Sequence, residues 1–260
     1  MTKQPAYTRI DFAPVADPDA VVTAGNARFT VLGPRLIRME YAPDGCFEDR
    51  PSQAFWYRRQ PVPRYVVTRD DSGLVLTTDY LRLEYAGQGR PFAADSLRVT
   101  LLPDGPVWRY GDPAPGNLLG TARTLDQVSG SMKLEPGLLS RDGWTVIDDS
   151  RSLAFGEAKW LTARDSADGS HDLYFCGYGQ AYHEALRAYL SVTGDVPLLP
   201  RWALGNWWSR YWEYSDGDLR ALMTDFREHD VPLGVCIVDL DCHLVNVGEG
   251  INGWTGYTWN

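Results

Sequence analysis

The sequence predicts an N-terminal antiparallel β-sandwich followed by the first βα units of an incomplete (β/α)8 TIM barrel. Short period-two apolar segments, separated by Gly, Pro and Asp turns, fill residues 27–103 and are typical of an antiparallel sandwich. Near the end of the chain, almost continuously apolar segments flank one amphipathic helix, which is typical of a parallel sheet. We therefore expect a sandwich domain with a linker helix over residues 1–198 and the start of a barrel over residues 199–260.

The predicted sandwich strands alternate apolar and polar side chains. In LIRMEYA (36–42), Ile37, Met39 and Tyr41 alternate with Arg38 and Glu40. Two later segments repeat this pattern and place one set of apolar residues on one face of each strand: Leu81, Leu83 and Tyr85 in the first, and Leu97, Val99 and Leu101 in the second.

Residues 111–150 break this rhythm, because they are rich in Gly and Asp and too irregular for one long strand. We expect loops and short strands there, and a further strand in DLYFCGYG (172–179). The segment QAYHEALRAYLSVTG (180–194) predicts a helix closed by Gly194. Its apolar stripe consists of Ala181, Ala185, Leu186 and Tyr189.

The last part of the chain has a strand, helix, strand pattern. WALGNWW (202–208) and VPLGVCIVD (231–239) predict buried strands, and SDGDLRALMTDFREHD (215–230) predicts a helix with Ser215 or Asp216 at its N-cap. A βαβ unit of this kind belongs to a parallel sheet. A complete barrel takes about 250 residues, so residues 200–260 supply roughly a quarter of one. We expect the chain to end inside its barrel and to expose strand edges unless a partner covers them.

Composition excludes several partner classes. The formal net charge of −9 argues against nucleic acid, since phosphate binding needs clustered Lys and Arg. No apolar run approaches the roughly 20 residues that span a bilayer, and the N-terminus lacks a signal-peptide pattern. We expect a cytoplasmic protein without a membrane partner and with reduced cysteines, which are Cys46, Cys176, Cys236 and Cys242.

The segment VCIVDLDCH (235–243) ends an apolar strand in acids and an imidazole. Asp239, Asp241 and His243 are two residues apart and share a face while the strand continues. Carboxylates at the carboxyl ends of barrel strands are where functional groups lie, but Asp also commonly orders a following loop. A divalent-metal site is a third interpretation, supported only weakly without further ligand spacing.

Two other segments carry candidate binding residues. RDGWTVIDDS (141–150) contains Asp142, Asp148 and Asp149, which either reach a neighbouring site or form Asp-based turns. NWWSRYWEY (206–214) places aromatic rings around Arg210, either as a shelf for sugar rings or as ordinary packing. The rings are those of Trp207, Trp208, Tyr211 and Trp212.

Other catalytic and cofactor classes lack their minimum residues. GYGQAY (177–182) has Tyr182 in place of the third glycine of a dinucleotide fingerprint. The chain contains no G-x-S-x-G, Walker A or C-x-x-C motif. We predict neither a cofactor nor a bound metal.

Several segments together resemble glycoside hydrolase family 31, the α-glucosidase and α-xylosidase family. In chain order they are GNLLGTARTLDQVSG, LEPGLLSRDGWTVIDDS, the long stretch from LYFCGYG to YWEYS, FREHDVPLGVCIVDLDCH and GWTGYTWN. They extend over about residues 112–260. The earlier strands are compatible with the N-terminal sandwich of that family.

The resemblance implies a set of substrate-binding residues. Asp239 matches the barrel Asp that hydrogen-bonds sugar hydroxyls in the −1 subsite, and Asp142 resembles the acid that a sandwich loop lends to the same pocket. Trp254 resembles a ring lining that pocket, and Trp212 or Tyr211 resembles the aromatic after the first barrel strand. His243 departs from the better-known forms of the family, where this place is often aromatic or Met.

The resemblance also implies that the bond-breaking acids lie elsewhere. Family members retain anomeric configuration with a carboxylate nucleophile and a carboxylic acid/base, both on later barrel strands. We therefore expect no catalytic residue before Asn260, and an inactive chain when residues 1–260 stand alone.

The implied partner is an α-linked oligosaccharide or α-glycoside. The alternative is a non-catalytic carbohydrate-binding or scaffold module. Neither interpretation predicts an oligomeric state.

Overall fold

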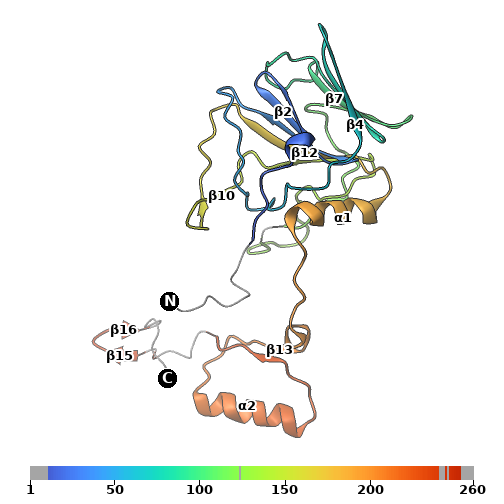
Figure 1. Cartoon of the computed structure of the whole chain (residues 1–260). Helices are drawn as coiled ribbons and strands as arrows, with labels where there is room; N and C mark the ends of the chain where they lie inside the picture. Colours follow the sequence, from blue (N-terminus) through green and yellow to red (C-terminus); the bar gives the residue numbers. More distant parts are fainter. Residues whose placement is uncertain (1–10, 123, 240–243, 245, 253–260) are drawn as a thin grey trace. The chain divides into compact units, whose positions relative to one another are not determined.

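The computed structural model describes residues 11–122, 124–239, 244 and 246–252. The chain divides into two compact units, Met1–Asp195 and Val196–Asn260, which are described separately (Figure 1). The first unit is the expected antiparallel sandwich, and the second contains the expected parallel strand pair with its helix. No helix among the described residues has the length and apolar character needed to cross a membrane.

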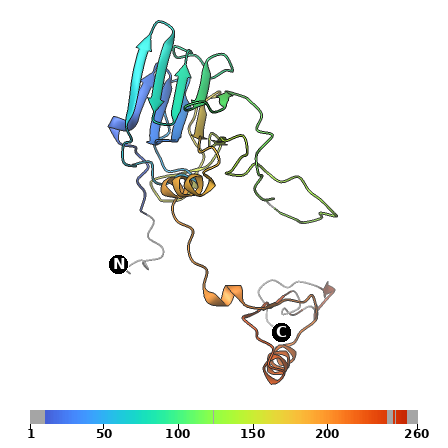
Figure 2. The same ribbon diagram turned by 90° about the vertical axis from the view of Figure 1, so that its right-hand side faces the viewer.

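Two five-stranded antiparallel sheets form the sandwich and stack face to face (Figure 2). The first sheet has the order β1 (Val21–Ala24), β2 (Ala27–Gly33), β3 (Leu36–Tyr41), β12 (His171–Cys176) and β9 (Thr145–Asp148). The second sheet is a meander of β4 (Tyr65–Asp70), β5 (Gly73–Thr78), β6 (Leu81–Tyr85), β7 (Leu97–Leu101) and β8 (Val107–Arg109). The unit also contains the short 3-10 helix η2 (Pro18–Ala20) and a hairpin of β10 (Ala154–Phe155) with β11 (Leu161–Thr162).

The main hydrophobic core lies between the two sheets. In β6, Leu81, Leu83 and Tyr85 are buried while Arg82 between them is exposed, so the predicted alternation is confirmed there. Apolar residues from the inner faces of both sheets complete the core, including Phe29, Val31, Ile37, Met39, Leu76, Leu97, Val99, Leu173 and Phe175. Their burial is the main driving force for stacking the sheets.

The strand β3 differs from a strand with one solvent-facing side, because all six of its residues are buried. Its polar residues lie in a cluster of buried charges rather than in water. Arg38 donates to both carboxylate oxygens of Asp172, each at 2.8 Å, and Arg28 donates to Glu40 at 2.7 and 2.8 Å. Pairing of this kind is what permits charged side chains to be buried.

A second apolar cluster covers the outer face of the first sheet. There the ring of Phe55 stacks on Tyr174 with centroids 3.5 Å apart, and helix α1 (Tyr182–Thr193) contributes the buried Val192. Figure 2 shows α1 against the sandwich. The helix ends at Gly194 (φ 105°), as the sequence predicts.

Residues 111–122 and 124–144 form a long irregular segment, and the short strand β9 follows it, as expected for the region 111–150. The irregular segment extends away from the sandwich as a loop (Figure 2). A single β-bridge between Asn117 and Ser140 joins its two arms near the base, and the Asn117 side chain accepts from Gly137 N–H at 2.8 Å. The base of the loop is therefore fixed by hydrogen bonds at a point close to Asp142.

The second unit contains a parallel βαβ element, as expected. Strand β13 (Trp207–Trp208) pairs with β14 (Val235–Cys236) in parallel, and α2 (Asp216–Glu228) connects them. Ser215 is the N-cap of α2, and its hydroxyl accepts from Asp218 N–H in a capping box. A second small hairpin joins β15 (Asn246–Gly248) to β16 (Ile251–Asn252).

The expectation of long buried strands in this unit is wrong. The first part of WALGNWW forms the 3-10 turn η3 (Arg201–Leu204), which begins after Pro200, and only two residues pair as β13. Trp202 is 56% exposed and Trp207 48% exposed. The strands have little cover because, in the part of the chain that the structure describes, β13 pairs only with β14.

Candidate functional site

The carboxyl edge of the β13 and β14 pair carries the first group of candidate residues. Because the two strands are parallel, the segments that follow Trp208 and Cys236 leave the pair at the same edge. Tyr211 and Trp212 follow β13, and the half-buried Asp239 follows β14. The structure thus brings an acid and two rings to one edge of the pair, where barrel enzymes place functional groups.

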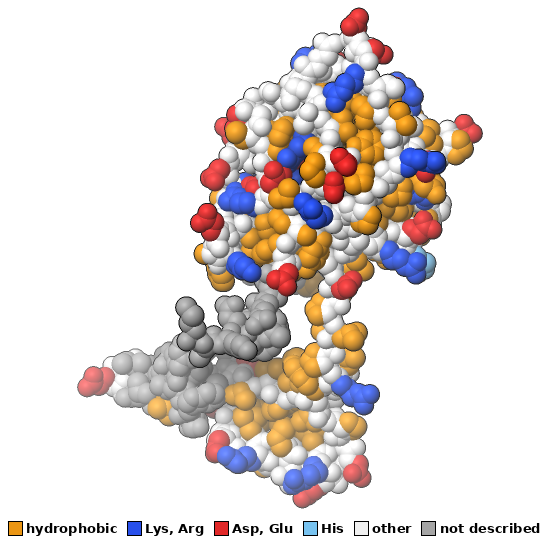
Figure 3. All heavy atoms as spheres, in the orientation of Figure 1, with side chains coloured by type: hydrophobic (Ala, Val, Ile, Leu, Met, Phe, Trp, Pro, Cys, Tyr) orange, Lys and Arg blue, Asp and Glu red, His pale blue; other side chains and the backbone are white. Residues whose placement is uncertain are grey.

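The aromatic residues at this edge divide between packing and exposure. Trp208 packs edge-on against Phe226 of α2, with ring centroids 5.3 Å apart. Tyr211 and Trp212 are 74% and 54% exposed, and the guanidinium of Arg210 lies 4.2 Å from the Trp212 ring centroid. Trp208 therefore has the packing role, while the exposed Tyr211 and Trp212 leave the shelf interpretation open as a prediction. Figure 3 shows hydrophobic side chains exposed on this unit.

Asp142 belongs to the sandwich unit, at the base of the long loop. Its Oδ2 accepts from the Gly116 N–H at 2.8 Å and from the Ser140 hydroxyl at 3.2 Å, while its own N–H donates to Ser140 Oγ at 3.0 Å. A Cβ on Gly116 would lie 2.4 Å from Asp142 Oδ1, so the carboxylate sits directly on this glycine. These contacts fix the side chain and leave Oδ1 without a hydrogen bond among the described residues.

Ser140 and Gly116, which hold Asp142, were not predicted from the sequence. The spacing S-x-D is the available signal for Ser140, since a hydroxyl two residues before an Asp commonly closes a local turn. Gly116 carries no such signal, because it is 26 residues away and its role depends on the closure of the whole loop.

The other two acids of RDGWTVIDDS have structural roles. Asp148 is exposed and accepts from Ser150 N–H at 2.9 Å in a local turn. Asp149 is buried and pairs with Arg164 at 2.6 Å. Burial and the neighbouring Asp172 carboxylate raise the Asp149 pKa despite this pairing. Asp148 thus follows the turn alternative that the sequence left open, whereas the buried ion pair of Asp149 was not predicted.

Several candidates lie outside the described residues, namely Asp241, His243 and Trp254. The metal interpretation of Asp239, Asp241 and His243 is therefore untested. Among the residues that are described, no group of three or more His, Cys, Asp or Glu side chains is arranged to hold a metal ion. Cys46, Cys176 and Cys236 are free thiols, while Cys242 is outside the described residues.

The chain combines an antiparallel β-sandwich with a parallel βαβ element, and an acid and aromatic rings follow the strands of that element. The family model of the glycosyl hydrolases family 31 TIM-barrel domain matches residues 196–260. This part of the chain is similar to the barrel domain of glycoside hydrolase family 31, which agrees with the sequence resemblance.

Curated relatives agree with this assignment. The chain is 29% identical over 170 residues to an α-xylosidase of Saccharolobus solfataricus, a match that covers 59% of this chain and 21% of that enzyme. It is 37% identical over 81 residues to α-glucosidase 2 of Bacillus thermoamyloliquefaciens, covering 31% of this chain and 10% of that one. The chain thus spans about a fifth of the first relative's length and a tenth of the second's.

Solved structures share the fold. A family 31 dextranase of Flavobacterium johnsoniae, in complex with glucose, superposes with a TM-score of 0.54 at 14% identity, covering 90% of this chain and 34% of the dextranase. An uncharacterised Listeria monocytogenes protein, solved with glucose, magnesium and calcium, gives a TM-score of 0.51 at 18% identity, covering 87% of this chain and 26% of that one.

Proposed function

We propose that residues 1–260 are the amino-terminal part of a retaining α-glycoside hydrolase of the α-glucosidase or α-xylosidase type, acting on terminal α-linked sugars. The observation that carries this proposal is the match of residues 196–260 to the family barrel domain, with Asp239 at the carboxyl edge of its strand pair. The α-xylosidase and α-glucosidase among the relatives support the substrate class.

In this proposal the chain supplies a wall of the −1 subsite. The Asp239 carboxylate accepts hydrogen bonds from sugar hydroxyls, and these bonds can strengthen as the ring distorts toward an oxocarbenium-like transition state. Asp142 presents Oδ1 to a sugar hydroxyl, and Ser140 and Gly116 hold its carboxylate through Oδ2. Trp254 and Tyr211 or Trp212 contribute the apolar ring faces. The nucleophile and the acid/base belong to later barrel strands, so residues 1–260 alone hydrolyse nothing.

The first test is the DNA that follows the codon for Asn260. If the frame continues, the extended polypeptide should hydrolyse an aryl α-glucoside or α-xyloside with retention, while a polypeptide of residues 1–260 should be inactive. Asp239→Asn and Asp142→Asn in the extended enzyme should each lower kcat/KM by about a hundredfold, because bonds that strengthen in the transition state are lost.

The matched control is Asp148→Asn, since Asp148 is an exposed turn acid of the same segment. It should leave kcat/KM within about a factor of two. Inversion of the anomeric product, or full activity of the two site variants, would contradict the proposal.

A non-catalytic carbohydrate-binding module is the second candidate. The observation that favours it is the exposed pair Tyr211 and Trp212, which could stack on sugar rings without any catalytic acid. Titration calorimetry of residues 1–260 with α-linked oligosaccharides tests it. Heat that saturates and is lost in Trp212→Ala supports binding, whereas no heat excludes this alternative.

A further inference from the structure

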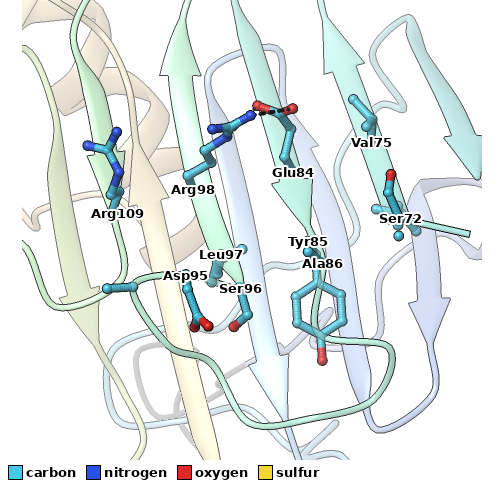
Figure 4. A pocket seen from close by; sticks show the side chains of 13 residues that line it. Ser72, Val75, Glu84, Tyr85, Ala86, Asp95, Ser96, Leu97, Arg98 and Arg109 are labelled. Atoms are coloured by element: carbon cyan, nitrogen blue, oxygen red, sulfur yellow. Dashed lines mark hydrogen bonds and ion pairs between the residues drawn. The ribbon is translucent and has the colours of Figure 1, made fainter.

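The outward face of the second sheet carries a hollow of about 350 Å³, lined by both apolar and charged residues. Strands β5 to β8 and the turn before β7 form its floor and rim (Figure 4). This volume is within the range of roughly 300–1,000 Å³ that small-molecule sites occupy. The proposed glycosidase activity assigns no role to this face, so its charges need their own explanation.

Three charged residues stand side by side across the strands of the hollow. Glu84 on β6 is the register partner of Arg98 on β7, and Arg98 is the register partner of Arg109 on β8. Arg98 donates to Glu84 through Nε at 2.7 Å and through Nη2 at 2.9 Å (Figure 4). Arg82 adds a contact of 3.3 Å to the same carboxylate. The hydrogen bonds from Arg98, followed by the one from Arg82, lower the pKa of Glu84 and keep its carboxylate ionised.

Arg109 has no corresponding acid. Its backbone N–H donates to Asp112 at 2.8 Å, but its guanidinium makes no hydrogen bond or ion pair with any residue that the structure describes. Like charges directly opposite one another on an antiparallel pair are destabilising. The ladder therefore contains three guanidinium groups and one carboxylate, which leaves two positive charges uncompensated, and Arg109 is the arginine among them that has no contact with the carboxylate of Glu84.

The free donors in the hollow match an anionic group. Arg98 uses Nε and Nη2 on Glu84, so its Nη1 remains, and all of the Arg109 guanidinium N–H groups remain. Guanidinium groups form paired bonds to carboxylate and phosphate oxygens with good geometry. The exposed Asp95 at the other end of the hollow is an acceptor for ligand hydroxyls (Figure 4).

We propose that this hollow binds an oxyanion, a carboxylate or a phosphate group carried on a small hydroxylated ligand, between Arg98 and Arg109. The bound anion replaces the carboxylate that the ladder lacks. The binding requires only the sandwich unit, because every residue of the hollow belongs to Met1–Asp195. It is independent of the glycosidase proposal.

The test is an NMR titration of the ¹⁵N-labelled chain of residues 1–260 with four probes: D-glucuronate, glucose 6-phosphate, inorganic phosphate and neutral glucose. The amide signals of Arg98 and Arg109 should shift and saturate with a Kd on the order of 1 mM for an anionic probe, as expected for a small ligand held by few bonds. Saturation with glucuronate alone identifies a carboxylate ligand, and saturation with the phosphates alone identifies a phosphate ligand.

Two variants and a matched control make the test specific. Arg109→Gln should weaken binding about fivefold, because it removes a charged donor from a solvated site. Arg109→Glu should abolish binding and pair with Arg98 instead. The control Arg64→Gln removes the same charge from an exposed residue paired with Asp79 outside the hollow, and should bind like the unmodified chain. The proposal is overturned if the Arg98 and Arg109 signals show no saturable shift with any anionic probe, or if neutral glucose binds as tightly as the anionic probes. Unchanged binding in either Arg109 variant would also overturn it.

Discussion

At the scale of single residues, Asp172 is the acid on which the buried charges of the sandwich converge. Burial alone would raise its pKa, but the guanidinium groups of Arg38, Arg58 and Arg164 outweigh that effect. The Asp172 pKa therefore lies well below its ordinary value of 3.8. Arg38 and Arg164 contact its carboxylate at 2.7–2.8 Å.

We predict that Asp172→Asn lowers the free energy of unfolding by about 3–5 kcal/mol, because it leaves buried guanidinium charges without their acid. Urea unfolding, followed through the signal of the sandwich unit, measures this free energy. The control Asp165→Asn alters a 97% exposed carboxylate 3.9 Å from Arg50 and should change stability by less than about 0.5 kcal/mol. A similar effect of the two substitutions would contradict this account of the charge cluster.

The same residue predicts a pH dependence. Because the folded pKa of Asp172 is below the unfolded one, its stabilisation is present above about pH 4 and is lost as the pH falls toward the folded value. Burial raises the Glu40 and Asp149 pKa values, and these groups act in the opposite sense. The difference between the unmodified chain and Asp172→Asn isolates Asp172. This difference should shrink between about pH 5 and pH 2, and a constant difference would refute the assignment.

Gly116 provides the residue-scale test of how Asp142 is held. Gly116→Ala places a methyl group 2.4 Å from Asp142 Oδ1, so the carboxylate or the loop must move. We expect a loss of about 1–3 kcal/mol in the free energy of unfolding and shifted NMR signals for Ser140 and Asp142. Gly33→Ala is the control, because its nearest neighbour would be at an ordinary 3.6 Å. Equal behaviour of the two variants would show that Gly116 does not hold the acid.

Single residues also show how far the sequence could predict this molecule. The segments of Asp142 and Asp239 predicted these acids as candidate binding residues, and that role stays a prediction, while the hydrogen-bond partners of Asp142 depend on a loop closure that local pattern does not encode. The alternation of Arg38 and Glu40 identified a strand correctly. It did not reveal that their face is buried, because Asp172, the acid that pairs with Arg38, is 134 residues away.

At the scale of elements, the helices were the most predictable parts. Apolar residues repeat with the helical period in both α1 and α2. Gly194 follows α1 and Ser215 precedes α2. These are local signals, and tertiary contacts did not override them. The strands of the second unit were less predictable. Their apolar sequence indicated long buried strands, but strand length depends on neighbouring strands, and β13 has one partner within the described part of the chain.

The cap of α2 yields an element-scale prediction. Ser215→Ala removes the acceptor for Asp218 N–H and the hydroxyl that donates to the Asp218 carboxylate at 2.7 Å. We expect a cost of about 1 kcal/mol, seen as about fivefold faster hydrogen exchange of the α2 amides. Ser215→Asp is the matched variant, since Asp also caps helices, and should restore most of the protection. No difference between Ala and Asp at this position would exclude the cap as a source of helix stability.

At the scale of the whole molecule, the two units differ in how much core they hold. Both hydrophobic clusters, from Val22 to Val192, lie within Met1–Asp195. The residues that follow are strongly exposed, with Val196 at 76%, Leu198 at 99% and Leu199 at 64%. An exposed connecting segment after a self-contained core is a typical site of proteolytic cleavage.

We therefore predict that a protease that cleaves after Val or Leu cuts residues 196–199 under native conditions, and that the sandwich remains folded after the cut. Because both clusters stay intact, its thermal midpoint should be within about 4 °C of that of the whole chain, which corresponds to a change of roughly 1 kcal/mol. Mass spectrometry locates the cut and circular dichroism gives the midpoint. Exposed Leu125 in the long loop is a second expected cut site, and Leu125→Asp separates the two events. A fragment that unfolds on cleavage at 196–199 would mean that the sandwich depends on the second unit for its stability.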